Sequence, residues 1–283
     1  MRWISDDAIG RLRAIEDQPD FAATRYTLLD RLGSGGMGVV FRGHDRELDR
    51  AVAIKVTALA TDADAERLRA EARTLARLEH PGIVAVHDVG RLPDGRVFTV
   101  MMLVRGERLD ARAAQVPLAD RLRLFDRVCD AVAFAHNKGV VHGDLKPANI
   151  MVGAHGEVLV LDWGGGRTPG YAAPESSTQP VDARADVYAL GRILHGLLRD
   201  ATGRTVRPLN SIVMRASEAD PAARYQAVAD LAADVRRFID GGAVTAHRET
   251  VGERTMRLAL AYRTPIALVL AYLVMRALLL LAR

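Results

Sequence analysis

Lysine is scarce in this sequence, and the few positions that keep it are candidates for residues with a chemical role. Of the 39 basic residues only three are lysines, at positions 55, 138 and 146, and the other 36 are arginines. A chain that uses arginine wherever charge alone suffices keeps a lysine where a compact ammonium does work that a planar guanidinium cannot do. Lys138 lies beside Gly139 and fits an exposed residue retained by chance. Lys55 and Lys146 are therefore the candidates for a chemical role.

A glycine-rich stretch precedes Lys55. Gly33, Gly35 and Gly38 follow the spacing G-x-G-x-x-G, which is a weak signal alone because dinucleotide-binding folds share it. In those folds the last glycine opens a helix, whereas here it opens the strand-like run VVF. Such a turn lets backbone N–H groups approach phosphate oxygens. Taken alone, the stretch is either a phosphate-binding turn or a plain loose turn.

Six further motifs accompany this stretch, and together they resemble the protein kinase family, in particular bacterial serine/threonine kinases. They are V-A-I-K at 52–55, H-G-D-L-K-P-A-N at 142–149, D-W-G at 162–164, Y-A-A-P-E at 171–175, D-V-Y-A-L-G at 186–191 and D-P-A-A-R at 220–224. The resemblance covers roughly residues 26–240, with the motifs in the family's order. It implies an α+β, bilobal protein-kinase-like fold, with a small antiparallel β lobe before a larger α-rich lobe, and an enzyme that uses ATP.

The resemblance implies catalytic roles for four residues. Asp144 would accept the proton of the substrate hydroxyl, and Lys146 would hold the γ-phosphate. Lys55 would neutralise the α- and β-phosphates of ATP. An ion pair with Glu71, on the helix that follows, would fix the ammonium of Lys55 in place.

The same resemblance implies a metal site and a nucleotide site. Asn149 and Asp162 would ligate Mg²⁺ or Mn²⁺ through oxygen atoms, which hard cations prefer. The residues implied to contact ATP come from the glycine-rich stretch, the neighbouring strands and the second lobe: Leu32, Gly33, Ser34, Gly35, Gly36, Met37, Gly38, Val40, Ala53, Lys55, Met102, Leu103 and Met151. Arg224 of the last motif would pair with Glu175.

Two departures from the family pattern bear on the substrate. Gly143 replaces the arginine that grips a phosphorylated activation loop in regulated kinases, and residues 165–172 are all that remains of that loop. We therefore expect activity that does not depend on phosphorylation of the loop. Thr168 either contacts Asp144 and Lys146, as the family's threonine does, or is an ordinary turn residue.

Three functions remain open from the sequence. The first is an active kinase that phosphorylates Ser or Thr in a protein of unknown identity. The second is a nucleotide-binding pseudokinase scaffold, because the shortened loop removes part of the platform for a peptide. The third is a small-molecule phosphotransferase, because the motif His-Gly-Asp at 142–144 also occurs in kinases of the aminoglycoside kinase type, which share the fold. Lys146, the Y-A-A-P-E segment and the D-V-Y-A-L-G motif favour the protein kinases.

The composition excludes disordered, collagen-like and disulfide-scaffold proteins. The chain has 283 residues, of which 49% are hydrophobic and 26% charged, as is typical of a folded globular protein. Residues 1–240 carry 33 basic and 33 acidic side chains, so we expect no nucleic-acid partner. Cys129 is the single cysteine, which excludes an intramolecular disulfide and fits a reducing compartment. We expect it to be buried in a helix.

The hydrophobic pattern predicts the elements that position these residues. Short apolar runs predict strands at 26–32, 39–45, 51–58, 83–89 and 96–103 and a hairpin at 150–162. Helical spacing predicts helices at 5–16, 62–79, 118–136, 184–199 and 225–240. We expect five parts: an accessory helix at 1–25, the β lobe at 26–105, the α-rich lobe at 106–240, a basic linker at 241–262 and a hydrophobic helix at 263–283.

The C-terminal part predicts a membrane anchor. Residues 264–282 contain one charge, Arg276, in an otherwise apolar run of spanning length. Arginines at 248, 254, 257 and 263 precede the run, as the positive-inside rule requires for a cytoplasmic body. The alternative is a helix that packs on the kinase or lies on the membrane surface. Acidic residues near the N-terminus, where a signal peptide needs an apolar run, also favour a cytoplasmic body.

Overall fold

The structure is a computed structural model that describes residues 19–35, 38–57, 62–164, 166–178, 180–199 and 206–281. At some helical positions, Glu71 among them, it describes the backbone alone. The helix expected at 5–16 and two residues of the glycine-rich stretch, Gly36 and Met37, lie outside the described residues.

The first lobe is a five-stranded antiparallel sheet with one helix. Its strands are β1 (Tyr26–Gly35), β2 (Gly38–Asp45), β3 (Arg50–Thr57), β4 (Val86–Arg91) and β5 (Val97–Met102), in the order β1-β2-β3-β5-β4. Helix α2 (Asp62–Leu75) lies between β3 and β4 in the chain. Val52, Ile54 and Val56 alternate along β3 and pack with Phe98 in the core of this lobe, as expected for a strand that buries one face.

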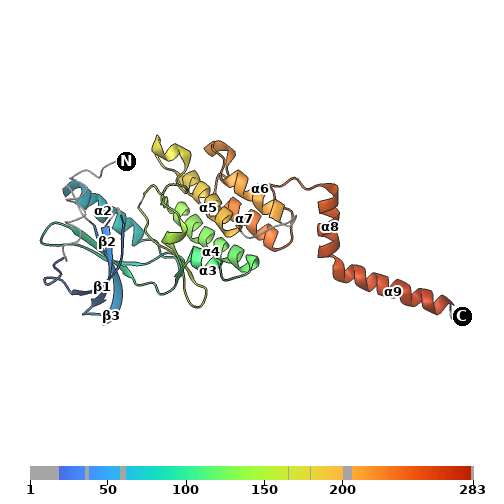
Figure 1. Ribbon diagram of the computed structural model, residues 1–283, viewed down its shortest axis with the longest axis horizontal. Coiled ribbons are helices and arrows are strands. Elements are labelled where there is room, and N and C mark those ends of the chain that lie inside the picture. Colours follow the sequence, from blue (N-terminus) through green and yellow to red (C-terminus); the bar gives the residue numbers. More distant parts are fainter. Residues whose placement is uncertain are drawn as a thin grey trace.

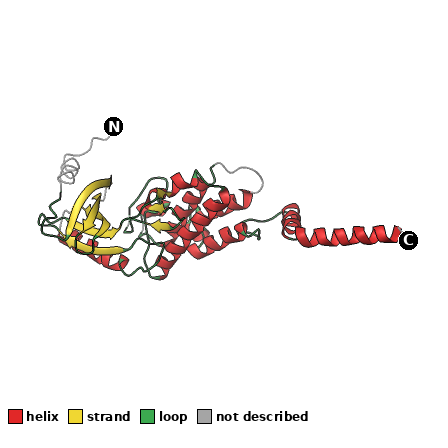
Figure 2. Cartoon of the chain, turned by 90° about the horizontal axis from the view of Figure 1, so that it is seen from below, coloured by secondary structure: helices red, strands yellow, loops and turns green. Residues whose placement is uncertain are grey.

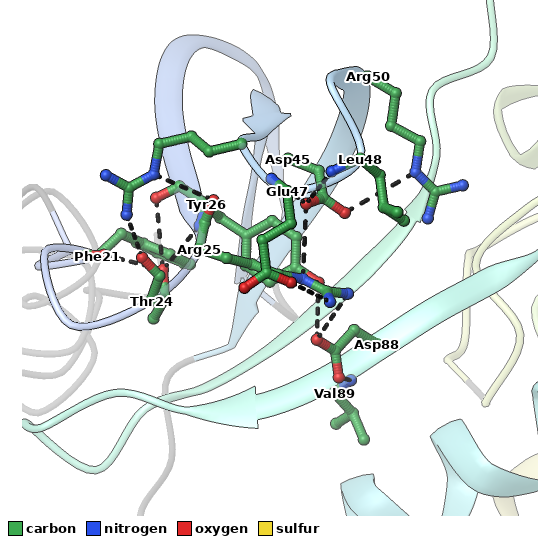
Figure 3. A network of polar contacts seen from close by, with 11 residues as sticks. Phe21, Thr24, Arg25, Tyr26, Asp45, Glu47, Leu48, Arg50, Asp88 and Val89 are labelled. Carbon is green, nitrogen blue, oxygen red and sulfur yellow. Dashed lines mark hydrogen bonds and ion pairs between the residues drawn. The ribbon is translucent and has the colours of Figure 1, made fainter.

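A polar network closes the end of this sheet that lies opposite the glycine-rich turn (Figure 3). Asp45 is fully buried between Arg25 and Arg50, whose nearest nitrogens lie 3.6 and 3.8 Å from its carboxylate oxygens. The hydroxyl of Tyr26 donates to Oδ2 of Asp88 at 2.7 Å. Burial, together with this bond, raises the pKa of Tyr26 to about 12. Because a buried charge is costly without partners, the network favours one arrangement of the strand ends.

The second lobe is mainly helical. Its main elements are β6 (Glu107–Arg108), α3 (Leu109–Ala113), α4 (Leu118–Asn137), β7 (Ile150–Val152), β8 (Val158–Val160), α5 (Ala183–Leu197), α6 (Arg207–Ala216) and α7 (Val228–Ile239). Short 3-10 helices lie at η1 (Pro147–Asn149), η2 (Pro174–Ser177) and η4 (Pro221–Ala223). Strands β6, β7 and β8 form a small antiparallel sheet. The expected α+β fold of two lobes is confirmed, and Cys129 is buried in α4 as predicted.

Two more helices, α8 (Val251–Ala261) and α9 (Arg263–Leu281), follow the second lobe. Both views show α9 extending away from the lobes toward the C-terminus (Figure 1, Figure 2). Its large apolar side chains between 268 and 275 are each at least 51% exposed. Within the part of the chain that the structure describes, no helix combines the length and apolar content needed to cross a membrane. The spanning helix expected at 263–283 is therefore not confirmed; α9 begins with Arg263 and contains Arg276.

Several predicted elements are present with shifted ends. Helix α2 ends at Leu75 rather than at residue 79, and Leu78 turns into the core, where it is 5% exposed. Strand β4 begins three residues after Ile83, which instead forms a bridge to Val160. Helix α7 begins at Val228 rather than at residue 225, since the preceding residues make buried side-chain contacts outside the helix. The segment expected as a linker contains α8.

Candidate active site

Lys55 and Asp162 meet between the two lobes. Lys55 lies in β3 and Asp162 follows β8, and the Nζ of Lys55 donates to Oδ1 of Asp162 at 3.1 Å. The lysine side chain is 18% exposed. Asp162 has a φ of 54°, in the left-handed region that is uncommon outside glycine. Such backbone outliers gather at functional sites, where the surrounding structure holds them.

Asp144 accepts hydrogen bonds on both carboxylate oxygens. Lys146 donates its Nζ to Oδ2 at 2.6 Å, and Thr168 donates its N–H and its hydroxyl to Oδ1 at 3.0 and 2.7 Å. The Nζ of Lys146 also lies 2.7 Å from the Thr168 hydroxyl, so the three side chains form a closed triangle. Burial raises the pKa of Asp144, but the bonds from Lys146 and Thr168 outweigh it and leave the pKa below its ordinary value. Thr168 therefore contacts both partners and is not an ordinary turn residue.

Two buried side chains hold the backbone around Asp144. Asp186 in α5 is 1% exposed and accepts from the N–H groups of His142 and Gly143 at 2.8 and 2.9 Å. The Nδ1 of His142 accepts from the N–H of Asp144 at 3.2 Å, so the proton sits on Nε2 and is donated to the carbonyl of Leu161 at 2.9 Å. Burial lowers the pKa of His142. A neutral imidazole therefore positions Asp144.

Asn149 lies beside Asp144 and connects it to the segment around Asp162. The side-chain Nδ2 of Asn149 donates to the backbone carbonyl of Asp144 at 2.9 Å. The backbone carbonyl of Asn149 accepts from the N–H of Leu161 at 2.8 Å. Among the described residues no group of three or more His, Cys, Asp or Glu side chains can hold a metal ion. The amide oxygen of Asn149 and the carboxylate of Asp162 are the donors that Mg²⁺ prefers, and Mg²⁺ completes its shell with water and phosphate oxygens. These two residues therefore fit a metal carried in with a nucleotide.

The residues expected to contact ATP come from both lobes. They lie on β1 (Leu32, Gly33, Ser34, Gly35), β2 (Gly38, Val40), β3 (Ala53, Lys55), the last residue of β5 and the residue after it (Met102, Leu103) and β7 (Met151). Val40 pairs with Lys55 across β2 and β3. A Cβ at Gly38 would lie 2.2 Å from the carbonyl oxygen of Val56, so only glycine fits where the turn enters β2. The side chain of Glu71 lies outside the described part, and its ion pair with Lys55 stays a prediction.

The shortened activation loop is held at several points. Besides the bonds from Thr168, Arg192 of α5 donates its Nε to the carbonyl of Gly170 at 3.1 Å. Further along, Arg224 pairs with Glu175 through two bonds of 2.7 and 2.8 Å, as predicted. Sequence reasoning missed Arg192, because its partner is a backbone carbonyl 22 positions away and no motif marks it.

Comparison with known proteins agrees with this geometry. A family model described as "Protein kinase domain" matches residues 26–207. The serine/threonine-protein kinase PknB of Mycolicibacterium smegmatis is 34% identical over 85% of this chain and 47% of the relative. PknB of Mycobacterium tuberculosis H37Rv is 32% identical over 86% and 47%, and PknD of Chlamydia caviae is 29% identical over 77% and 31%.

The chain spans less than half the length of these curated relatives. The family match nevertheless covers most of the chain and includes the five-stranded sheet, the H-G-D-L-K-P-A-N motif at 142–149 and the shortened activation loop. These matches, together with the geometry around Asp144 and Lys55, show that the chain belongs to the protein kinase family, among the bacterial serine/threonine kinases.

Proposed function

We propose that this chain is an ATP-dependent protein kinase that phosphorylates Ser or Thr in a protein. The observation that supports this most strongly is the triangle of Asp144, Lys146 and Thr168, joined through Asn149 to the segment that bears Asp162. Phosphoryl transfer needs positioning and charge neutralisation more than covalent catalysis. Asp144 offers an ionised carboxylate as the proton acceptor. Lys55 and Lys146 offer ammonium groups, and Asn149 and Asp162 offer oxygen ligands for a metal.

Each residue then has a separate task. The substrate oxygen attacks the γ-phosphorus while its proton passes to Asp144, and the bond from that phosphorus to the bridging oxygen of ADP breaks. Lys146 neutralises charge on the transferred group, and Lys55 neutralises the α- and β-phosphates. Asn149 and Asp162 would hold Mg²⁺ or Mn²⁺, which when bound neutralises charge on the β- and γ-phosphates.

A transfer assay separates this proposal from its two rivals. Purified protein is mixed with radiolabelled ATP, Mg²⁺ or Mn²⁺, dephosphorylated casein and, separately, small alcohols and aminoglycosides. Label on Ser or Thr of casein, lost in the Asp162→Asn variant, supports the proposal. ATP binding without transfer to any acceptor indicates a pseudokinase scaffold, and label on the small molecules alone indicates the third function.

We further propose that the C-terminal helices hold the enzyme at a membrane, with the kinase lobes in the cytoplasm. The exposed apolar side chains of α9 support this, since large apolar patches on monomers are rare and mark interaction sites. Exposed Arg248 and Arg254 suit anionic headgroups.

Cell fractionation tests the membrane proposal. We expect the full chain in the membrane pellet after a detergent-free wash, and a variant with Leu270→Glu and Val274→Glu in the supernatant. Release of the wild-type chain by alkaline carbonate would indicate attachment at the surface. Recovery of the wild-type chain in the soluble fraction before that step would contradict the proposal.

A further inference from the structure

The chain stays packed on the second lobe after α7 ends. Val244 is 4% exposed and belongs to the core of that lobe. The Nδ1 of His247 lies 3.0 Å from the hydroxyl of Ser211 in α6. We call residues 242–250, between α7 and α8, the docked tail.

Asp234 in α7 is the centre of this packing. It is fully buried and accepts from the N–H and hydroxyl of Thr245 at 2.9 and 2.6 Å and from the N–H of Ala246 at 3.1 Å. The hydroxyl of Tyr225 and the Nη1 of Arg237 donate to it at 2.8 and 2.7 Å. Burial raises the pKa of Asp234, but the bonds from Thr245, Tyr225 and Arg237 outweigh it and leave the pKa below its ordinary value. A buried, ionised carboxylate thus joins the docked tail to Tyr225.

Tyr225 and its neighbour Arg224 are held from opposite sides. Tyr225 is 2% exposed and donates toward the docked tail through Asp234. The side chain of Arg224 is 0% exposed and binds both carboxylate oxygens of Glu175. Glu175 lies in η2, directly after the shortened activation loop. Hydrogen bonds and one peptide unit therefore connect the docked tail to the segment that follows this loop.

We propose that Asp234 is a positioning residue through which the docked tail fixes the segment at 171–178 and so promotes binding of a protein substrate. The physical reason is that a densely packed interior transmits displacement and that a saturated polar network favours a single arrangement. The effect on substrate binding rests on the proposed function, whereas the effect on the segment at 171–178 is independent of it.

Hydrogen exchange tests the connection without requiring activity. The full chain is compared with Tyr225→Phe and Thr245→Val, each of which removes one hydroxyl donor to Asp234. Thr245 is otherwise exposed, so its replacement leaves the core filled. The matched control is Thr255→Val in α8, whose hydroxyl donates to the carbonyls of Val251 and Gly252 of the same helix.

We expect amide exchange at 171–178 to rise about 3- to 10-fold in both test variants and to stay unchanged in the control. The amides of Ser176 and Thr178, which donate to the carbonyls of Ala173 and Glu175, are the reporters. Faster exchange confined to 242–250, with 171–178 unchanged in both test variants, would overturn the proposal and leave Asp234 a structural residue of the tail.

Kinetics test the consequence for the substrate. With casein as acceptor, we expect KM for casein to rise several-fold in Tyr225→Phe and Thr245→Val while KM for ATP and kcat stay close to wild type. An equal change in both KM values contradicts a role in the substrate segment. Absence of transfer by the wild-type chain contradicts the proposed function instead, and the exchange result then stands by itself.

Discussion

At the scale of single residues, the environment of Asp144 determines what its carboxylate can do. Both oxygens already accept hydrogen bonds, and the pKa lies below its ordinary value. A carboxylate of this kind is a weak base, so in the proposed mechanism its main contributions would be to orient a substrate hydroxyl and to take the proton late in the transfer. This division suits a reaction in which positioning and charge neutralisation supply most of the rate.

The first prediction follows from this division of tasks. Asp144→Asn should lower kcat by a factor on the order of 10² to 10⁴, the usual contribution of a general base, while ATP still binds. Radiometric transfer and calorimetric ATP titration measure the two effects. Lys55→Met should instead weaken ATP binding, and Lys138→Met, the same change on the surface, should alter neither. Undiminished transfer by Asp144→Asn would remove that residue from the mechanism.

The second prediction concerns His142 and pH. Its folded pKa is lowered by burial, so below about pH 6.5 the unfolded chain binds more protons than the folded one and stability falls as the pH falls. His142→Phe removes this titration but also two hydrogen bonds, which costs about 1–3 kcal/mol at pH 7. Measured by urea unfolding, the free energy of unfolding should fall less between pH 7 and pH 5 in the variant than in the wild-type chain.

A matched control makes the pH result specific. His155 is an exposed histidine at the tip of the β7–β8 hairpin, and His155→Phe should leave the loss of stability between pH 7 and pH 5 as in wild type. If His142→Phe loses as much stability over this range as wild type does, the neutral ring is not what holds the loop.

Much of the site could be predicted at this scale. Lys55, Asp144 and Asn149 lie in short motifs that resemble those of the protein kinase family, and the resemblance implied the role of each. Arg192 and Asp234 could not be predicted, because they have ordinary residue types and their partners are backbone groups or distant side chains. Contacts of this kind are set by packing rather than by spacing.

At the scale of elements, the described part of the shortened activation loop, residues 166–172, is held by bonds to its own lobe. Thr168 is bound to Asp144 and Lys146, and Arg192 holds Gly170. Ordering a loop by phosphorylation lowers its conformational entropy, and here side-chain bonds already do this. Gly143, moreover, offers no guanidinium to a phosphate.

The third prediction is that phosphatase treatment leaves the rate unchanged and that Thr168→Glu does not activate the enzyme. We expect this variant to be at least tenfold slower, because a second carboxylate would face Asp144 and disfavour its ionised form. Initial rates before and after phosphatase treatment provide the measurement. A large drop in the initial rate after phosphatase treatment, reversed by incubation with ATP and traced to Thr168, would show that phosphorylation regulates this loop.

Periodicity identified most elements but placed some of their ends wrongly. The pattern at 225–240 is helical throughout, yet the helix begins only at Val228, because Arg224 and Tyr225 are bound to Glu175 and Asp234. Hydrophobic spacing records which face is buried and contains no information on such polar contacts. Polar contacts also set the start of α8, where the hydroxyl of Thr250 accepts from the N–H of Glu253 and the carboxylate of Glu253 accepts from the N–H of Thr250, as in a capping box.

At the scale of the whole molecule, the folded unit extends beyond α7 and includes the docked tail. The fourth prediction compares two truncations. A chain that ends after Tyr262 should unfold at the wild-type temperature, because the described side chains of α9 are exposed. A chain that ends after Gly241 should unfold about 10 °C lower, because it loses the buried Val244 and leaves Asp234 short of donors, together worth about 3–5 kcal/mol.

Calorimetry of all three chains in one detergent buffer checks this. Equal unfolding temperatures for both truncations would place the end of the folded unit at α7. A lower temperature for the longer truncation would show that α9 contributes to the stability of the lobes.

The placement of the lysines also makes the molecule unusually easy to probe. An amine-directed reagent has three side-chain targets in the chain: Lys55 and Lys146, which are 18% and 25% exposed in the site, and Lys138 at the exposed end of α4. Lys138 is therefore an internal standard. The ratio of labelling at Lys55 and Lys146 to labelling at Lys138, followed by mass spectrometry, reports whether a nucleotide covers the candidate site, without knowledge of the substrate.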